Sequence, residues 1–319
     1  MMLSRRIRAG AIAFALACAL PAAQAAAPLA RNQAPGFYRM MLGDFEVTAI
    51  SDGTVDLPMT KLLTRTTPAE SKRAYDRAFL KDPVETSVNA YLVNTGSKLV
   101  LIDTGAGKLF GPTLGTLIAN LKAAGYQPEQ IDEIYITHMH PDHVGGLAAD
   151  GKPVFPNAVV RADKHDADFW LDPKTLAGAA KDDRASVEGA QASLAPYVAA
   201  GKFRPFEGEA ELVPGVKAHA SHGHTPGHTT YVVESKGQKL ALWGDLMHVA
   251  AVQFPEPSVT IQFDTDSKAA MAQRKKAYAD AAKGGYWVAG AHLSFPGIGH
   301  LRGDGKGYAF QPANYTSLR

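Results

Sequence analysis

Four side chains that commonly bind divalent metals fall within six residues of one another. His138, His140, Asp142 and His143 lie in the segment THMHPDHVGG, directly after a short apolar run. On an extended segment, side chains two residues apart point the same way, so His138 and His140 can bind one ion together. Pro141 then turns the chain, and Asp142 and His143 can face a second ion. Imidazole and carboxylate groups are ligands that suit zinc and similar divalent ions.

A histidine-rich surface loop is the alternative to a metal site in this segment. The apolar run Ile131–Thr137 predicts a short buried strand that leads straight into the histidines. Gly145-Gly146 permits a close backbone approach as the next helix begins. Four polar groups delivered to the interior would be costly to bury without a cation. The sequence therefore predicts that this segment binds metal.

Strands and helices around this segment predict an α/β protein. Asp44–Ser51 alternates as a strand, which the Asp52-Gly53 pair is expected to end with a turn. Apolar residues recur at helical spacing in Phe110–Ala124, and the alanine-rich Lys268–Lys283 predicts a late helix. Asp163–Ala200, rich in alanine and charges, is expected to add helices over the surface.

The two halves of the chain share one pattern. Ser87–Asp103 predicts two apolar strands around a turn at residues 94–96, and the second strand ends in a carboxylate. Tyr231–Asp245 repeats the pattern of Tyr91–Asp103 with a slightly longer connection. We interpret this as an internal pseudo-repeat, in which two β-rich halves pack sheet against sheet with helices outside.

The N-terminus has the pattern of an export signal. Ser4–Arg8 is positively charged, Ala9–Leu20 is apolar, and Ala23-Gln24-Ala25 is a small-x-small cleavage site. The apolar run is too short to cross about 30 Å of hydrocarbon as a helix, which disfavours a membrane anchor. The expected organisation is a removed signal peptide at 1–25, a flexible stretch at 26–36 and a single domain at 37–319.

Composition excludes several partners and mechanisms. The formal net charge is +2, but removal of Arg5, Arg6 and Arg8 with the signal leaves 30 basic and 31 acidic residues. This balance predicts no nucleic-acid partner and no membrane partner. Cys18, the single cysteine, lies within the signal, so the mature chain has no disulfide, thiolate ligand or cysteine nucleophile. We expect an exported bacterial protein, periplasmic or secreted.

The histidine segment resembles the HxHxDH signature of the metallo-β-lactamase superfamily. Two further segments fit the resemblance, GHTPGHT at residues 223–229 and AHLSFPG at residues 291–297. The resemblance implies an αββα sandwich, in which two packed mixed β-sheets are flanked by helices. It implies seven ligands for two divalent ions: His138, His140 and His224 on one ion, Asp142, His143 and His292 on the other, and Asp245 shared. Zinc is expected foremost, with manganese, cobalt, iron or cadmium as alternatives.

The remaining polar residues near these motifs receive supporting roles. We interpret His228 as a buried residue beside the ligands, and Asp103 as a carboxylate that supports the ligand loop through hydrogen bonds. Trp243 and Trp287 are expected in the core. The other histidines outside the ligand set are expected to be structural or solvated: His165, His219, His222 and His300.

The expected chemistry is hydrolysis by a hydroxide shared between two ions. Two ions about 3.5–4 Å apart can share a water and lower its pKa, so that hydroxide forms near neutral pH. Asp142 and Asp245 would orient this nucleophile. His248 lies three residues after Asp245, where lactonases of the superfamily can carry a tyrosine that contacts the substrate carbonyl. We predict that His248 is a hydrogen-bond donor or general acid there; the alternative is a side chain that points away.

From Ala34 onward the chain is similar to methyl parathion hydrolases, whose relatives include lactone and aryl-ester hydrolases such as dihydrocoumarin hydrolases. The resemblance places Phe110 and Trp170 in the substrate pocket, where they can stack on an aromatic ring. The chain departs from the phosphotriesterase pattern at four positions of the pocket. Phosphotriesterases carry arginine, leucine, threonine and leucine there, whereas this chain has, in the same order, Leu62, His248, Ile261 and Phe263.

These departures favour a planar ester over a tetrahedral phosphorus. Ile261 and Phe263 are bulky and apolar and are expected to narrow the pocket. The sequence predicts a lactonase or aryl esterase for small apolar substrates, with weak organophosphate triesterase activity. A methyl parathion hydrolase-type phosphotriesterase and a non-catalytic exported metal-binding protein are the alternatives. Members of the subfamily form dimers, so the resemblance also implies a homodimer.

Overall fold

The computed structural model describes residues 27–181 and 183–318 of the chain. The predicted signal peptide at residues 1–25 lies outside the described residues. Residues 27–36 form neither helix nor strand, and the described helices and strands belong to one compact unit, Pro35–Arg319. Among the described residues, no helix is both long enough and apolar enough to cross a membrane.

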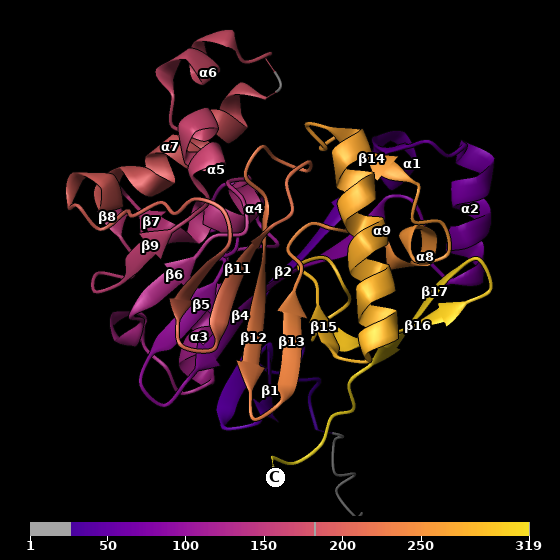
Figure 1. Ribbon diagram of the computed structural model, residues 1–319, viewed down its shortest axis with the longest axis horizontal. Helices are drawn as coiled ribbons and strands as arrows, with labels where there is room; N and C mark the ends of the chain where they lie inside the picture. Colours follow the sequence, from indigo (N-terminus) through magenta and orange to yellow (C-terminus); the bar gives the residue numbers. More distant parts are fainter. Residues whose placement is uncertain (1–26, 182, 319) are drawn as a thin grey trace, which may run out of the picture. The chain divides into compact units, whose positions relative to one another are not determined.

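Two mixed β-sheets form the centre of this unit (Figure 1). The first sheet has the order β1 (Phe37–Leu42), β2 (Phe45–Leu57), β4 (Val84–Asn94), β5 (Leu99–Ile102), β6 (Glu133–Tyr135) and β9 (Val159–Arg161). The second sheet has the order β10 (Ala210–Val213), β11 (Val216–Ala220), β12 (Thr229–Ser235), β13 (Gln238–Leu242), β15 (Trp287–Ala289), β16 (Ile298–Asp304) and β17 (Gly307–Pro312). Two short pairs are separate: β3 (Leu63–Thr64) with β14 (Thr260–Ile261), and β7 (Ala148–Ala149) with β8 (Lys152–Pro153).

The two sheets share one apolar cluster between their facing sides. Tyr91 and Val93 of β4 belong to the same buried cluster as Tyr231 and Val233 of β12. The rings of Tyr135 and Tyr231 stack with their centroids 5.5 Å apart. Burying such side chains gains roughly 25 cal/mol per Å² of apolar surface, so this contact holds the sandwich together.

Helices cover the outer faces of both sheets. Leu121 of α3 (Leu117–Ala123) and Leu194 of α7 (Arg184–Ala199) join the apolar cluster outside the first sheet. Tyr278 of α9 (Ser267–Gly284) joins the cluster outside the second sheet, and Figure 1 shows α9 lying along that sheet. The predicted αββα sandwich is therefore confirmed. The other α-helices described are α1 (Met59–Leu62), α2 (Pro68–Arg77), α4 (Pro141–Val144), α5 (Lys164–Trp170), α6 (Pro173–Gly178) and α8 (Ala250–Gln253).

The pseudo-repeat is confirmed by the strand pairing. In the first half, β4 pairs antiparallel with β5, and β5 pairs parallel with β6. In the second half, β12 pairs antiparallel with β13, and β13 pairs parallel with β15. Asp103 directly follows β5, and Asp245 follows β13 after two further residues. The two carboxylates therefore occupy corresponding places in the two halves.

The predicted turn at Asp52-Gly53 is wrong. β2 continues through both residues, and its pairing with β4 shifts register between Ser51 and Gly53. Gly53 has a φ of +124°, a conformation that residues with a side chain rarely adopt. A glycine in a strand with a register shift makes a β-bulge, so the pair that resembled a turn bends a continuous strand.

The predicted helix Phe110–Ala124 begins seven residues later than expected, at Leu117. Gly111 and Gly115 both have positive φ, and this keeps the preceding residues in a loop. The apolar residues at helical spacing therefore begin before the first residue at which the backbone is helical.

Asp52 holds this loop in place. Its side chain is fully buried and accepts hydrogen bonds from the backbone N–H groups of Ala106 (2.8 Å), Gly115 (3.0 Å) and Leu117 (3.0 Å). Burial raises the pKa of Asp52, while these three donors lower it. A single carboxylate thus ties the bulge in β2 to the start of α3.

We expect Asp52→Asn to lower the free energy of unfolding by about 1–3 kcal/mol, because its amide NH₂ would face backbone donors that then lose an acceptor. Urea unfolding followed by circular dichroism measures the change. Asp56→Asn, an exposed position in the same strand, is the matched control and should stay within about 0.5 kcal/mol of wild type. Equal midpoints for the two variants would contradict this role of Asp52.

Candidate metal centre

The seven predicted ligands come together where loops from both sheets meet. The loop after β6 carries His138 and His140, and α4 carries Asp142 and His143. The second half adds one residue from each of three loops, which follow β11, β13 and β15: His224, Asp245 and His292.

The first cluster brings three imidazoles together. The Nδ1 atom of His140 lies 2.9 Å from Nε2 of His138 and 3.1 Å from Nε2 of His224. Burial and the neighbouring imidazoles lower the pKa of His140 to about 3 and lower that of His138 as well. Both rings are therefore neutral at neutral pH and offer lone pairs, as metal ligation requires.

The second cluster consists of Asp142, His143 and His292. The Nε2 atoms of His143 and His292 lie 3.5 Å and 3.6 Å from Oδ2 of Asp142. Asp245 lies between the two clusters, with Oδ1 3.2 Å from His143 Nε2 and Oδ2 3.1 Å from His292 Nε2. The same Oδ2 atom is 3.3 Å from His224 Nε2 in the first cluster. A carboxylate in this position can be shared by two ions.

Some of these donor atoms make no hydrogen bonds to one another and are available to bind divalent ions. The buried atoms His143 Nε2 and Asp245 Oδ1 lie 3.2 Å apart, yet neither makes a hydrogen bond of suitable geometry to any described residue. Buried polar atoms without partners are costly, and a cation between them would remove that cost. Nitrogen and oxygen ligands with these spacings are the set that zinc and similar ions bind. The residues present therefore fit two divalent ions.

Two carboxylates orient the histidines from behind. Asp103 Oδ2 lies 2.8 Å from Nδ1 of His143, and Oδ1 accepts the N–H of Thr137 at 2.8 Å. The predicted support of the ligand loop by Asp103 is thus confirmed. Asp264, which the sequence analysis missed, lies 2.9 Å from Nδ1 of His224. Such partners fix the ring orientation and raise the basicity of the nitrogen that faces the ion.

His228 is buried beside the ligands, as predicted. Its Nε2 accepts the backbone N–H of Asp245 at 3.0 Å, so its proton is on Nδ1, which donates to Oγ of Ser221 at 2.8 Å and lies 3.2 Å from the carbonyl of the same residue. Burial lowers the pKa of His228 to about 3. A neutral His228 therefore positions the backbone of the shared carboxylate.

Helix α5 connects the two ligand loops through a residue that the sequence analysis also missed. Asp166 is fully buried; its Oδ2 accepts the N–H of Met139 at 2.9 Å, and its Oδ1 accepts the N–H of Gly227 at 2.6 Å. Met139 lies between two ligands of the first half, and Gly227 follows His224. One turn later, Trp170 packs edge-on against the ring of His140 at 5.2 Å. Nothing in the local sequence distinguishes Asp166 from Asp168, which is exposed on the same helix.

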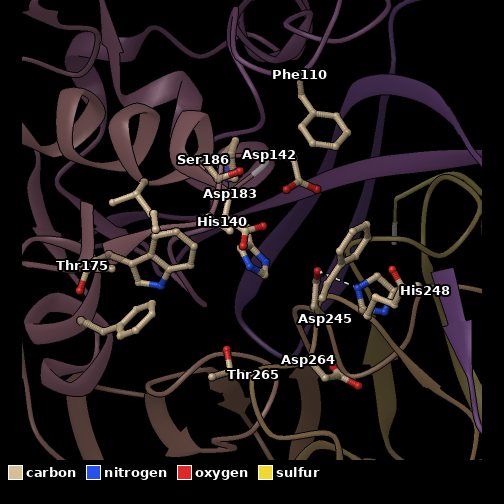
Figure 2. A pocket seen from close by; sticks show the side chains of 18 of the residues that line it. Phe110, His140, Asp142, Thr175, Asp183, Ser186, Asp245, His248, Asp264 and Thr265 are labelled. Carbon is tan, nitrogen blue, oxygen red and sulfur yellow. Dashed lines mark hydrogen bonds and ion pairs between the residues drawn. The ribbon is translucent and has the colours of Figure 1, made fainter. Parts of the chain in front are cut away.

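His248 points toward the shared carboxylate, so the alternative that it points away is wrong. Its Nε2 lies 3.1 Å from Oδ2 of Asp245 (Figure 2). Its ring stacks on His292 with centroids 5.1 Å apart. Burial lowers the pKa of His248 to about 4, and a nearby cation would lower it further. A ring that is neutral at neutral pH can donate a hydrogen bond, but it is a poor general acid.

The two clusters open into a cavity of about 760 Å³. His140, Asp142, Asp245 and His292 reach its floor together with His248. Figure 2 shows Phe110 above Asp142 and Asp245. Most of the apolar part of the wall comes from Leu57, Phe110, Phe169, Trp170, Val187 and Phe263. Phe110, Trp170, His248 and Phe263 therefore line this cavity, and their contact with a substrate stays a prediction.

Leu62 and Ile261, also predicted as pocket residues, are not among the residues that line this cavity. Ile261 is completely buried in a separate apolar cluster, against which Leu62 packs. The cause is the short β3–β14 pair, which places Ile261 opposite Leu63. The expectation that Ile261 narrows the pocket is therefore wrong. Of the two bulky residues expected to narrow it, Ile261 and Phe263, only Phe263 lines the cavity.

Comparison with known proteins agrees with this geometry. The metallo-beta-lactamase superfamily matches residues 83–282, which is more than half of the chain. The chain belongs to this superfamily. Membership agrees with the expectation of a metal-dependent hydrolase.

Several relatives of this superfamily member are lactonases. N-acyl homoserine lactonase of Bacillus cereus is 26% identical over 171 residues, which cover 48% of this chain and 60% of that protein. The chain thus matches about three fifths of the length of such curated relatives. The crystal structure of AbOPH, a hydrolase in the beta lactamase superfamily, is 40% identical with a TM-score of 0.85 over 90% of this chain and 100% of its own. AidC, a dizinc quorum-quenching lactonase in complex with its product, is 29% identical with a TM-score of 0.82 over 88% of this chain and 99% of its own.

We expect Asp166→Asn to weaken metal binding by about tenfold to a hundredfold, the usual effect of losing a partner behind the ligands. The amide would place NH₂ against a backbone N–H and loosen one of the two ligand loops. Competition with a chromogenic chelator measures the affinity.

Asp168→Asn is the control for this experiment, because Asp168 lies on the same helix with its side chain 64% exposed. It should bind metal as the wild type does. A folded Asp166→Asn protein with unchanged metal affinity would show that Asp166 does not position the ligands.

Proposed function

We propose that this chain is a binuclear metal-dependent hydrolase that cleaves lactones and aryl esters of the dihydrocoumarin type. We further propose weak organophosphate triesterase activity at the same site. The observation that carries the proposal is the position of both donor clusters at the floor of one cavity whose walls are aromatic and aliphatic.

The shape and chemistry of the cavity support an apolar ester. A volume of about 760 Å³ is within the usual range for small-molecule sites. Phe110, Trp170 and Phe263 offer ring faces and edges to an aryl group, and offset or edge-on contacts gain about 0.5–1.5 kcal/mol beyond area burial. The lactonase relatives support a carbonyl-centred reaction, since their substrates and products belong to that class.

The residues of the chain would divide the work of ester cleavage. Two divalent ions bound by the clusters would lower the pKa of water and polarise the ester carbonyl. Asp142 and Asp245 would accept hydrogen bonds from the attacking water and orient it. The Nε2 of His248 lies 3.1 Å from Oδ2 of Asp245. With the oxygens of Asp245 bound to the ions, an Nε2–H of neutral His248 would donate instead to the carbonyl oxygen as negative charge develops there. The apolar wall would exclude bulk water from this step.

A phosphotriesterase of the methyl parathion hydrolase type is the second candidate. One observation favours it: Ile261 is buried away from the cavity, so one of the two residues expected to exclude a tetrahedral phosphorus does not reach it. Phe263 still lines the cavity, 6.0 Å from the ring of His248. We therefore retain the lactone as the preferred substrate and place the discrimination on Phe263.

The proposal includes the setting in which the protein works. We propose that zinc occupies the centre, that the mature chain is exported, and that it forms a homodimer. The residue chemistry of the clusters supports zinc, and the N-terminal pattern of residues 1–25 supports export. The dimer rests on the resemblance alone.

We expect the metal-loaded mature enzyme to hydrolyse dihydrocoumarin with a kcat/KM at least tenfold above that for methyl parathion. Tenfold corresponds to about 1.4 kcal/mol of discrimination between the two transition states. Steady-state kinetics with both substrates measure the ratio. The reverse preference would support the phosphotriesterase, and no chelator-sensitive turnover of any ester or phosphotriester would support the non-catalytic metal-binding protein.

We expect His248→Ala to reduce kcat/KM for dihydrocoumarin by about tenfold to a hundredfold, since a donor to the carbonyl oxygen is lost. His248→Tyr, which keeps a donor, should retain more of the activity. Metal content is measured alongside the kinetics and should equal that of the wild type. Unchanged kcat/KM in His248→Ala would refute this role, and the loss of an ion would assign His248 to metal binding.

A further inference from the structure

Asp163, His165 and His222 form a third group of metal-binding side chains, separate from the seven ligands described above. Asp163 precedes α5 and His165 lies in its first turn, while His222 lies in the loop between β11 and β12. The sequence analysis treated both histidines as structural or solvated. The fold instead brings them to the two sides of one carboxylate.

The geometry of this group resembles that of the main centre. Oδ1 of Asp163 lies 2.8 Å from Nδ1 of His165, and Oδ2 lies 3.4 Å from Nε2 of His222. In the main centre, the separations between nitrogen and carboxylate oxygen run from 3.1 Å to 3.6 Å. Ligand atoms about 2.0–2.1 Å from a tetrahedral ion stand about 3.4 Å apart. A small outward movement of His165 would therefore admit an ion.

The charge of the group also favours a cation. The Asp163 side chain is completely buried, and the side chains that pair with it among the described residues are the two histidines. The neighbouring Lys164 pairs with Asp168 instead. A buried carboxylate that pairs with neither a lysine nor an arginine is costly, and two imidazoles with a carboxylate are a donor set for zinc, nickel or copper ions.

The histidines of this group are more exposed to solvent than those of the main centre. The side chains of His165 and His222 are 53% and 33% exposed. An ion can therefore enter directly, and water can complete its coordination. Because the carboxylate already accepts the backbone N–H of His165 at 2.7 Å, only the imidazole positions need to change when an ion binds.

We propose that Asp163, His165 and His222 form a peripheral site for one divalent transition-metal ion. An ion there joins the start of α5 to the β11–β12 loop, which carries the ligand His224 two residues after His222. These are the same two segments that Asp166 connects through Gly227. The peripheral ion therefore braces the ligand loop of the second half from outside the catalytic cavity.

Isothermal titration of the metal-loaded mature enzyme with Zn²⁺ tests the proposal. We expect one additional ion per chain in the wild type, and a loss of affinity of at least tenfold in His165→Ala and in His222→Ala. His219→Ala is the matched control, because the His219 side chain is 39% exposed and, among the described residues, belongs to no cluster of three metal-binding residues. This variant should bind the additional ion as the wild type does.

The readout is the difference between the wild type and the two variants, so it does not depend on the activity or on how many ions the main centre holds. Metal content after dialysis gives the same comparison independently. Absence of the additional ion in the wild type would overturn the proposal. Equal affinity in the wild type, His165→Ala and His222→Ala would also overturn it, since the ion would then bind elsewhere.

Discussion

The buried carboxylate of Asp245 has more imidazole neighbours than its two oxygens can accept hydrogen bonds from in good geometry. Ring nitrogens of five histidines lie 3.1–3.6 Å from its oxygens: His138, His143, His224, His248 and His292. Taking such a group of polar side chains out of water is costly unless charge and lone pairs are matched. Divalent ions match them, since each ion accepts several lone pairs at once. The two-sheet frame makes this possible, because its two halves deliver ligands to one place from opposite sides of the pseudo-repeat.

Hydrogen-bonding partners on the side of the ligands away from the ions fix the orientation of these ligand side chains. Asp103 holds His143 from the first half, and Asp264 holds His224 from the second. Asp166 connects the loops of the two halves through backbone N–H groups. Negative charge thus lies outside the imidazoles while the cations would lie inside them, and this arrangement raises the basicity of the nitrogens that bind. The centre is therefore held in place mainly by residues that would never contact an ion.

Short-range patterns predicted the two packed sheets, the pseudo-repeat and the metal-binding segment at residues 138–143, whereas His224, Asp245 and His292 were implied by the resemblance to the superfamily. A strand ending in HxHxDH and a strand ending in a carboxylate are visible locally. Asp166 and Asp264 were missed because their partners lie 27 to 61 residues away and their own surroundings are ordinary. The turn at Asp52-Gly53 was wrong for a related reason. The pair has a high propensity for turns, but β2 pairs with β4, which lies much later in the sequence, and this pairing keeps the strand continuous.

The walls of the cavity come largely from segments that carry no ligand, which separates substrate choice from metal binding. Thr175, Ser186 and Val187 lie on α6 and α7 and line the cavity without touching the centre. Trp170 is different, because its ring meets His140 and its helix carries Asp166. A change at Trp170 would therefore disturb both the pocket and the ligand loops, whereas a change on α6 or α7 would alter the pocket alone. The same reasoning applies to Ile261: buried under the wall in contact with β3, it can influence a substrate only by moving its neighbours.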